Sequence, residues 1–291
     1  MTENSPSLRN IAELMNELHA YTRQVVVIKI GGNSIAEDPD FLTAIAQQIE
    51  FLQSRHIRIV LVHGGGPQID RALTDAGITP VKGADGRRVT DPATMAVVAQ
   101  VMGAISQDVT VALEDQGCTA FNASALGVCY VEAESLQPEE FSHQDRTGRP
   151  VAVDAEGLSA KLEQGKIVVL NSVGRGADGH DYNVNADDYA MAVALALRAR
   201  RLILATNVAG VYDAEKKPIS LLTPKTAKSL IASGVIAGGM IPKVESALSA
   251  LTQGVGGVAI IDAHKNWALL GELLTRKGFG TLIASREPEL F

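Results

Sequence analysis

A lysine set into an apolar strand just before two glycines is the first feature that could do chemistry. The stretch VVVIKIGGNSI, residues 25–35, is typical of a buried strand that carries Lys29 near its end and is followed by Gly31 and Gly32. Glycine has no Cβ, so the backbone N–H groups of such a turn can approach an oxyanion closely. A cation beside accessible backbone donors favours the binding of phosphate.

A second glycine turn follows the next apolar strand. The segment HGGGPQ, residues 63–68, comes after IRIVLV and leads into a helical pattern. In open parallel sheets, ligands bind beyond the carboxyl ends of the strands, and the next helix adds the positive end of its dipole. Either turn alone is commonly structural, but the two turns together with Lys29 predict a cradle for an anion such as phosphate.

Two better-known nucleotide motifs fit poorly. No G-x-x-x-x-G-K-[ST] motif occurs. A G-x-G-x-x-G motif is present at Gly174, Gly176 and Gly179, but the next helix starts only near Ala186. The following strand, RLILAT, ends without an acidic residue for a ribose. These features disfavour a dinucleotide-dependent dehydrogenase.

Strands and helices must alternate to bring the two turns together. Strands are predicted at VVVIKI, IRIVLVH, CYVEA, PVAVD, KIVVLN, RLILAT, VAIID and GTLIAS. Helical patterns separate most of them, including 41–51, 92–102, 157–164, 224–233 and 242–253. This order predicts an α/β fold with a mostly parallel sheet and helices on both faces.

A glycine-rich polar stretch divides the chain. The segment SVGRGADGHD, residues 172–181, is predicted to be a loop at a functional boundary. We expect one continuous sheet with two lobes, an N-terminal lobe at 24–172 and a C-terminal lobe at 173–291. Residues 1–23 are expected to contain an amphipathic helix that packs on its own domain or pairs with another subunit.

Bulk composition limits the function classes. Hydrophobic residues make up 46% and charged residues 20% of the 291 residues, as in ordinary enzymes. The net charge of −7 disfavours nucleic-acid and anionic-membrane binding. Cys118 and Cys129 lack metal-ligand spacing and are expected in the core. No run of about 18 apolar residues and no signal-peptide pattern was found, so we expect a cytoplasmic protein.

Six motifs in the same order resemble the amino acid kinase family and, within it, the N-acetyl-L-glutamate kinases. They are KIGGNSI, VHGGGPQID, GRRVTDPATM, YNVNAD, GGMIPKV and GFGTLI, and the resemblance spans about residues 20–285. It implies a three-layer αβα sandwich, the amino acid kinase fold. It also implies transfer of the ATP γ-phosphate to the side-chain carboxylate of N-acetylglutamate, giving N-acetylglutamyl 5-phosphate and ADP.

The resemblance also implies residue roles. Lys29 and Lys243 would flank the transferring phosphoryl group, with Asp187 between them. The amino-acid substrate would be held by Gly65, Gly66, Arg88 and Asn183. ATP would be bound by Lys29, Gly31, Gly32, Asn207, Gly210, Tyr212, Met240 and Lys243, with Mg²⁺ held mainly by the phosphates and no metal site made by the protein. His63 is interpreted as structural, because the match assigns the work to the glycines.

The implied reaction agrees with elementary chemistry. A carboxylate nucleophile is ionised at neutral pH (pKa about 4.3), so no general base is needed. Catalysis then depends on positioning and on stabilising phosphoryl charge, and Lys29→Ala should lower turnover about 10²-fold. Arg88 suits a substrate carboxylate because it offers two parallel donors. Structural alternatives remain: an edge lysine at 29, a helix-start carboxylate at 187, a turn at 183, a solvated lysine at 243 and an ion pair at 88.

The C-terminal segment resembles the arginine-sensing region of feedback-inhibited members. In WALLGELLTRKGFGTLI, Glu272 and Gly278 would contact arginine, although Trp267 stands where many members have histidine. Such members also carry an N-terminal helix that links dimers into hexamers, so a homodimer or hexamer is expected.

Three departures leave alternatives open. AISQDVT, FNASALGV and Asn207 differ from the usual kinase pattern and also resemble the kinase-like domain of N-acetylglutamate synthases. In many synthases that domain is catalytically silent and binds arginine. The sequence ends at Phe291 without a further acetyltransferase domain and keeps Lys29, Asp187 and Lys243, which favours an active kinase. The alternatives are a family kinase for a related acidic amino-acid derivative and a non-catalytic arginine-binding module.

Overall fold

The strand that carries Lys29 lies in the middle of the sheet. The computed structural model describes residues 8–83, 86–134, 144–275 and 278–285. In β1 (Val25–Ile30), the side chains of Val26, Ile28 and Ile30 enter the core on one face of the sheet, and Val27 enters the core on the other. Because side chains alternate along a strand, Lys29 points to the same face as Val27.

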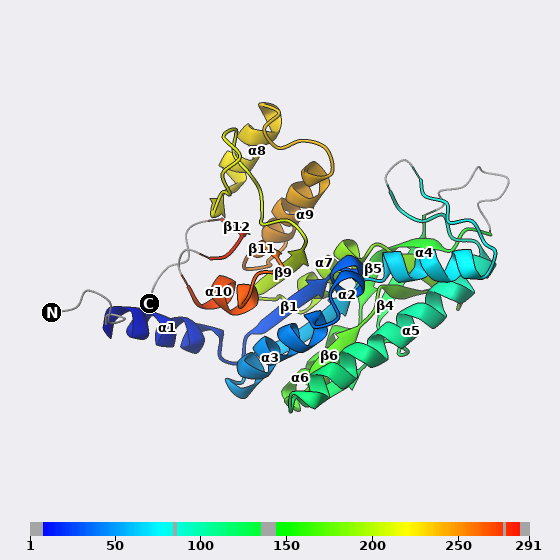
Figure 1. Ribbon diagram of the computed structural model, residues 1–291, viewed down its shortest axis with the longest axis horizontal. Coiled ribbons are helices and arrows are strands. Elements are labelled where there is room, and N and C mark those ends of the chain that lie inside the picture. Colours follow the sequence, from blue (N-terminus) through cyan, green and yellow to red (C-terminus); the bar gives the residue numbers. More distant parts are fainter. Residues whose placement is uncertain (1–7, 84–85, 135–143, 276–277, 286–291) are drawn as a thin grey trace.

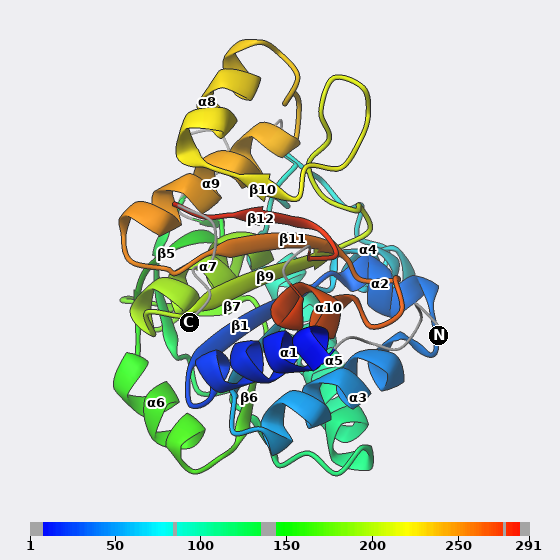
Figure 2. The same cartoon turned by 90° about the vertical axis from the view of Figure 1, so that its left-hand side faces the viewer.

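Eight strands form one twisted sheet that is parallel except at one end (Figures 1 and 2). Strand β12 runs antiparallel to β11, and β10 is parallel to β12. The order across the sheet is β10 (Leu221–Leu222), β12 (Thr281–Ile283), β11 (Val258–Asp262), β9 (Arg201–Thr206), β1, β2 (Arg58–His63), β6 (Ile167–Leu170) and β3 (Ala120–Asn122). The sheet is continuous across the boundary predicted at residue 172.

Helices cover both faces of the sheet, and each face has its own apolar core. Isoleucine and leucine dominate the first core, whereas valine and alanine are more frequent in the second. The first face carries α3 (Phe41–Ser54), α4 (Gly66–Asp75), α5 (Pro92–Asp115) and α10 (Ala268–Leu274). The second face carries α6 (Ala155–Glu163), α7 (Ala186–Ala196), α8 (Pro224–Ala232) and α9 (Met240–Thr252). The predicted three-layer αβα sandwich with a mostly parallel sheet is confirmed.

Beside the main sheet, four strands form a small closed barrel. They are β4 (Cys129–Ala133), β5 (Thr147–Val153), β7 (Val173–Gly176) and β8 (Asp181–Val184). The stretch predicted as a loop at 172–181 is therefore mostly the β7–β8 hairpin. Its glycines serve close packing: a Cβ on Gly174 would lie 2.2 Å from Val131 Cγ1, and one on Gly176 would lie 2.4 Å from Tyr182 Cε2. The helix expected near Ala186 is α7.

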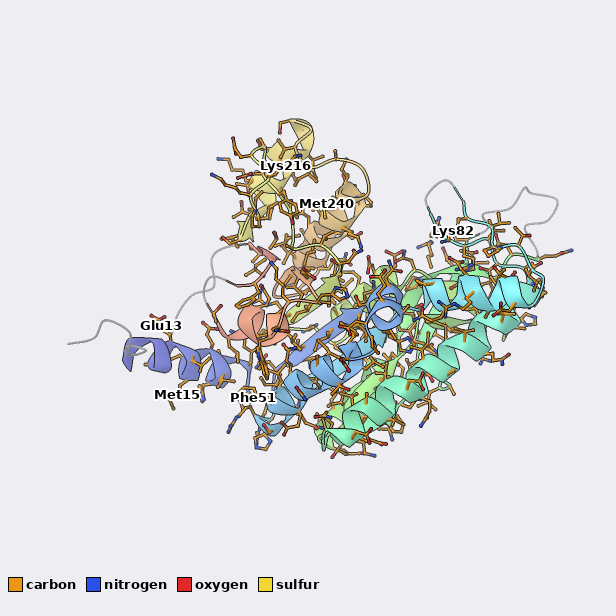
Figure 3. The ribbon with its side chains drawn as sticks, viewed as in Figure 1. Glu13, Met15, Phe51, Lys82, Lys216 and Met240 are labelled. Carbon is orange, nitrogen blue, oxygen red and sulfur yellow. The ribbon has the colours of Figure 1, made fainter. Side chains whose placement is uncertain are left out.

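Helix α1 (Leu8–Tyr21) lies at one side of the molecule and contacts α10. Its last residue, Tyr21, is buried, and its hydroxyl accepts a hydrogen bond from Arg201 Nη2 (2.7 Å). Met15 is 64% exposed and points away from the body of the protein (Figure 3). One end of the helix is therefore anchored in the core, while its middle presents an apolar side chain to solvent.

The longest helix, α5, is also a core element. Asp91 caps it by accepting a hydrogen bond from the Thr94 N–H, and Pro92 opens its first turn, as the sequence predicts. Of the described helices, only this one is long and apolar enough to cross a membrane by length and composition. It packs against α3 and α4, and Met102 and Val109 are buried in the first core. Both cysteines are buried and unpaired.

Candidate active site

The two predicted glycine turns lie side by side at the carboxyl edge of the sheet. Strands β1 and β2 are paired so that Ile30 lies opposite His63, and the next residues lead into α2 (Gly32–Glu37) and α4. A Cβ on Gly32 would lie 2.8 Å from the Gly65 Cα, so only glycine allows this approach. Gln68 Nε2 donates to the Gly32 carbonyl (3.0 Å) and ties the turns together.

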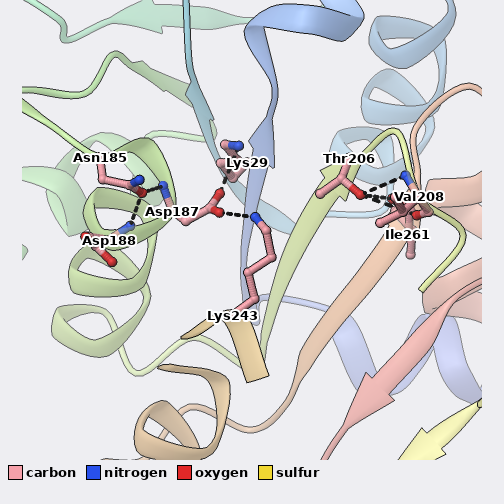
Figure 4. A network of polar contacts seen from close by, with 8 residues as sticks. All are labelled: Lys29, Asn185, Asp187, Asp188, Thr206, Val208, Lys243 and Ile261. Carbon is pink, nitrogen blue, oxygen red and sulfur yellow. Dashed lines mark hydrogen bonds and ion pairs between the residues drawn. The ribbon is translucent and has the colours of Figure 1, made fainter. Parts of the chain in front are cut away.

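Two lysines far apart in the sequence meet at one carboxylate (Figure 4). Lys29 Nζ lies 2.8 Å from Asp187 Oδ1, and Lys243 Nζ donates to Asp187 Oδ2. Lys29 reaches it from β1, Asp187 lies in the first turn of α7, and Lys243 lies in the first turn of α9. Helix α9 begins at Met240, two residues before the predicted start at 242. The structure therefore brings together the three residues predicted to be catalytic.

Charge keeps Asp187 ionised. Burial raises the pKa of Asp187, but the charges and hydrogen bonds of Lys29 and Lys243 outweigh it and bring the pKa down from 3.8 to about 2. Asn185 caps α7 and accepts hydrogen bonds from the N–H groups of Asp187 (2.8 Å) and Asp188 (3.2 Å). For Asp188 next to it, burial and the Asp187 charge raise the pKa. Asp187 therefore carries a full negative charge between two cations.

The glycine turns and the Lys–Asp–Lys cluster line one cavity of about 530 Å³. Among the described residues that line it, five are cationic and one is acidic. A chain with a net charge of −7 thus forms a positive cavity, which suits an anionic ligand. The predicted site residues in its lining are Lys29, Gly31, Gly32, Gly65, Gly66, Arg88, Asn183, Asp187, Asn207, Met240 and Lys243.

The predicted substrate arginine, Arg88, also lines the cavity. The Arg88 side chain is 6% exposed, and its Nη1 lies 2.6 Å from Asp70 Oδ1. Thr147 and Thr90 both donate to the Arg88 carbonyl, at 3.0 and 2.9 Å. Asn183 Nδ2 donates to Thr90 Oγ1 (3.0 Å). The loop before α5, which carries Arg88 and Thr90, and the small barrel, which carries Asn183, therefore share one polar network.

His63 stabilises the second glycine turn through its imidazole ring. Its ring is buried, Nδ1 donates to the Gly64 carbonyl (3.1 Å), and Nε2 lies 2.7 Å from Ser106 Oγ. Burial lowers the pKa of His63 from 6.5 to about 4, although the bond to Gly64 raises it slightly. The neutral ring can therefore hold both contacts, which agrees with the structural role expected from the sequence.

Two residues predicted for the nucleotide lie outside the cavity lining. Gly210 has φ 134° and packs against Thr281, where a Cβ would approach Oγ1 to 2.4 Å. Tyr212 forms an isolated β-bridge with Pro218 and is exposed. Their roles in ATP binding stay predictions.

The two predicted effector residues meet away from the cavity. Glu272 is buried in α10, and its Oε2 accepts from the N–H groups of Phe279 (2.9 Å) and Gly280 (3.2 Å). Gly278 has φ 63°, and a Cβ there would lie 2.6 Å from that oxygen. Trp267 precedes α10 with φ 60° and is exposed. Burial raises the pKa of Glu272 more than its hydrogen bonds and Arg201 lower it.

Several residues of the site were missed in the sequence. Lys82 and Arg87 line the cavity next to Arg88, and the basic spacing in VKGADGRR was the signal that could have revealed them. Asn185, two residues before Asp187, is an N-cap signal of a familiar type. Thr206 closes the loop that carries Asn207 by accepting a hydrogen bond from the Val208 N–H (3.2 Å, Figure 4). No local pattern marked Asp70, because its partner Arg88 lies in a distant loop.

The arrangement is suited to moving a phosphoryl group between two anions. Two ammonium groups and the glycine turns at the N-termini of α2 and α4 line one cavity, and Arg88 lines it as well. Within the described part of the chain, no group of three or more His, Cys, Asp and Glu residues could hold a metal ion. Asp187 is the single carboxylate among the described lining residues, and both its oxygens contact lysines.

Comparisons with known proteins agree with this chemistry. The sequence profile described as "Amino acid kinase family" matches residues 24–262. An acetylglutamate kinase of Cereibacter sphaeroides is 38% identical over 97% of this chain and 95% of its own length. That of Zymomonas mobilis is 37% identical over 94% and 93%. A solved structure of N-acetylglutamate synthase from Neisseria gonorrhoeae, complexed with coenzyme A and N-acetylglutamate, superposes with a TM-score of 0.84 at 26% identity. This chain is covered to 99% in that match but spans only 65% of the synthase.

Proposed function

Because the chain belongs to the amino acid kinase family, we propose that it phosphorylates the side-chain carboxylate of N-acetyl-L-glutamate with ATP. The products are N-acetylglutamyl 5-phosphate and ADP, and the reaction belongs to arginine biosynthesis. The observation that carries the proposal is the convergence of Lys29 and Lys243 on Asp187 beside two glycine turns. The proposal is also supported by relatives that are acetylglutamate kinases and that match this chain over nearly their whole length.

The phosphoryl group is expected to sit between the two lysines. Each ammonium has three hydrogens and gives one to Asp187, so two remain on each for phosphoryl oxygens. Gly31, Gly32 and Gly66 line the same cavity at the N-termini of α2 and α4, where backbone N–H groups lack partners within the helix and can bind further oxygens. These donors are fixed before substrate binds, which is the condition under which electrostatic stabilisation lowers a barrier most.

The acceptor needs positioning and no base. A side-chain carboxylate attacks phosphorus as an anion, so the two substrates must be held against their mutual repulsion. Arg88 and Asn183 are proposed to hold the amino-acid substrate at one end of the cavity. Met240 and Asn207 are proposed to border ATP at the other end, and Gly210 and Tyr212 to contact it from the loop after β9.

Mg²⁺ is proposed to arrive with ATP. The described lining residues offer it no free carboxylate, since Asp187 is engaged by both lysines. The residues present therefore do not form a protein site for the ion, and phosphate oxygens would be its main ligands. The metal would neutralise phosphate charge, while Lys29 and Lys243 would do the same from the protein.

A coupled assay of ADP release tests the proposal. We expect turnover with N-acetylglutamate and at least tenfold lower kcat/KM with glutamate, aspartate and N-acetylaminoadipate. A preference for one of the other acids would identify a different family kinase. ADP release with none of the four acids would contradict the kinase proposal.

Regulation and assembly are a separate part of the proposal. We propose that arginine inhibits by binding near Glu272 and Gly278, and that α1 joins subunits into a homodimer or hexamer in the cytoplasm. An arginine titration up to millimolar concentrations should lower activity. Light scattering with and without residues 1–23 should report the change in assembly.

A further inference from the structure

A second cavity lies at the edge of the sheet opposite the candidate active site. It has a volume of about 350 Å³ and is lined by residues at the amino ends of β2 and β6 and beyond the C-terminal ends of α3 and α6. Arg58, in its lining, is the first residue of β2, and His63, beneath the second glycine turn, is the last. At about 3.3 Å per residue, these two ends of β2 are roughly 16 Å apart. The described linings of the two cavities have no residue in common, so a ligand here would not overlap the active site.

The connections that form the walls of this second cavity are tied to one another. The Arg23 N–H, between α1 and β1, donates to the carbonyl of His56, between α3 and β2 (2.9 Å). Gln53 Nε2 donates to the carbonyls of Gly165 (2.7 Å) and Thr119 (3.1 Å), which join the end of α3 to the turns before β6 and β3. The walls are therefore held in place by the protein itself before any ligand binds.

The lining of the second cavity is basic. Arg23, Arg58 and Lys166 line it together with His56, and Glu163 is the one acidic residue among the described lining residues. No carboxylate in the described part of the chain forms an ion pair with Arg23, Arg58 or Lys166. In the active-site cavity, by contrast, each of the five lysines and arginines is paired with a carboxylate. The cations of the second cavity thus remain available for an anion from outside.

The types of side chain indicate the chemistry of that anion. A guanidinium group offers two parallel donors that match phosphate or carboxylate, whereas a lysine acts as a point charge. Lys166 Nζ lies 5.3 Å from the centre of the Phe121 ring, a contact that restricts where the ammonium can lie. The apolar part of the described lining is aliphatic, so it offers no aromatic face on which a nucleotide base could stack. These features favour a compact anion over a nucleotide.

We propose that this second cavity binds a small organic anion with two or more phosphate or carboxylate groups. Arg23 and Arg58 bind the anionic groups through their guanidinium donors, and Lys166 adds a third positive charge. The site is separate from the phosphoryl-transfer site, and its occupation does not require turnover.

Calorimetric titration with pyrophosphate and, separately, with citrate tests the proposal. Both anions also suit the active-site cavity, so the titrations are made in the full chain carrying Lys29→Met, which removes one cation there. Adding Arg23→Gln and Arg58→Gln should raise the Kd at least tenfold, because each change removes charge-assisted hydrogen bonds. Arg58→Lys keeps the charge without the paired donors and should recover part of the affinity. Comparison of the two probes shows whether phosphate or carboxylate is preferred, and binding of either one supports the site.

Arg55→Gln is the matched control. Arg55 lies three residues before Arg58, but it stacks over the Phe51 ring (5.3 Å to the centre) and is not among the described lining residues. We expect its Kd to equal that of Lys29→Met alone.

Two results would overturn the second site. One is the absence of binding by either probe in Lys29→Met. The other is a Kd unchanged by Arg23→Gln and Arg58→Gln, whether or not the Tm falls. A lower Tm with an unchanged Kd would mean that these arginines only neutralise the partial negative charges at the ends of α3 and α6.

Discussion

Asp187 offers the sharpest test of the Lys–Asp–Lys cluster, because one substitution affects both lysines. Asp187→Asn removes one negative charge and keeps the size and position of the side chain. Asn185 caps α7 through the backbone N–H of residue 187, so the helix start is unaffected by the change. What is lost is the ion pair of 2.8 Å to Lys29 and the bond from Lys243.

The expected effect falls on turnover. Removal of one fixed donor from a charge-stabilising site typically costs about 2.7–4 kcal/mol, or 10²–10³-fold in kcat. Asp187→Asn leaves both lysines in place but frees them to separate, since like charges near each other repel. We therefore expect kcat to fall about 10²-fold. The KM for ATP should stay equal or fall, because the cavity gains one unit of positive charge.

Asp188→Asn is the matched control. It lies in the same first turn of α7 but is not part of the cavity lining. We expect its kcat within about twofold of wild type in the same ADP-release assay. If Asp187→Asn kept kcat within threefold of wild type, or if both variants lost equally along with Tm, the proposed organising role of the carboxylate would be refuted.

Three other variants test the parts around this cluster. Gly32→Ala should lower kcat about 10²-fold and lower the free energy of unfolding by about 1–3 kcal/mol, because its Cβ would lie 2.8 Å from the Gly65 backbone. In Gly31→Ala the Cβ meets no atom within 4 Å, so kcat should fall less than tenfold. The ADP-release assay and urea unfolding measure these two effects. The pKa of His63 is lowered to about 4 in the folded protein, so the unfolded chain binds more protons between pH 6.5 and pH 4. The free energy of unfolding should therefore decrease as the pH is lowered, by about 2 kcal/mol at pH 5. His63→Gln should abolish this pH dependence of the urea midpoint. Asp187 has a pKa of about 2, so its contribution is complete above pH 4 and disappears toward pH 2, and Asp187→Asn should differ most from wild type in stability above pH 4.

The sequence predicted the parts of the fold that apolar periodicity controls. The central strands β1, β2, β6 and β9 are predominantly apolar runs, which is typical of strands buried on both faces. The β7–β8 hairpin was missed because its strands contain two glycines and charged residues. Those strands close a small barrel in which Gly174 and Gly176 are needed for contact with Val131 and Tyr182, and that requirement comes from tertiary packing.

The candidate site likewise contains residues that could be predicted from the sequence and residues that could not. The glycine turns could be predicted, because strand order places Gly31 and Gly65 at one edge of a parallel sheet. Lys243 and Asp187 were assigned by resemblance alone, since 56 residues separate them and no local pattern relates them. Asp70 had no such guide, because its role depends on which side of α4 faces Lys82 and Arg88.

The carboxylate in the middle of an anion site has a physical reason. A lysine alone is a flexible point charge, and two lysines in one cavity would repel each other and turn toward solvent. Asp187 removes one unit of charge but fixes both ammonium groups, and a total of five cations against one carboxylate in the described lining keeps the cavity positive. Asp70 holds Lys82 and Arg88 in a similar way. Each carboxylate weakens the attraction of the cavity for anions but fixes the orientation of two cationic donors. Transfer of a phosphoryl group between two anions depends more on the orientation of these donors than on their total charge.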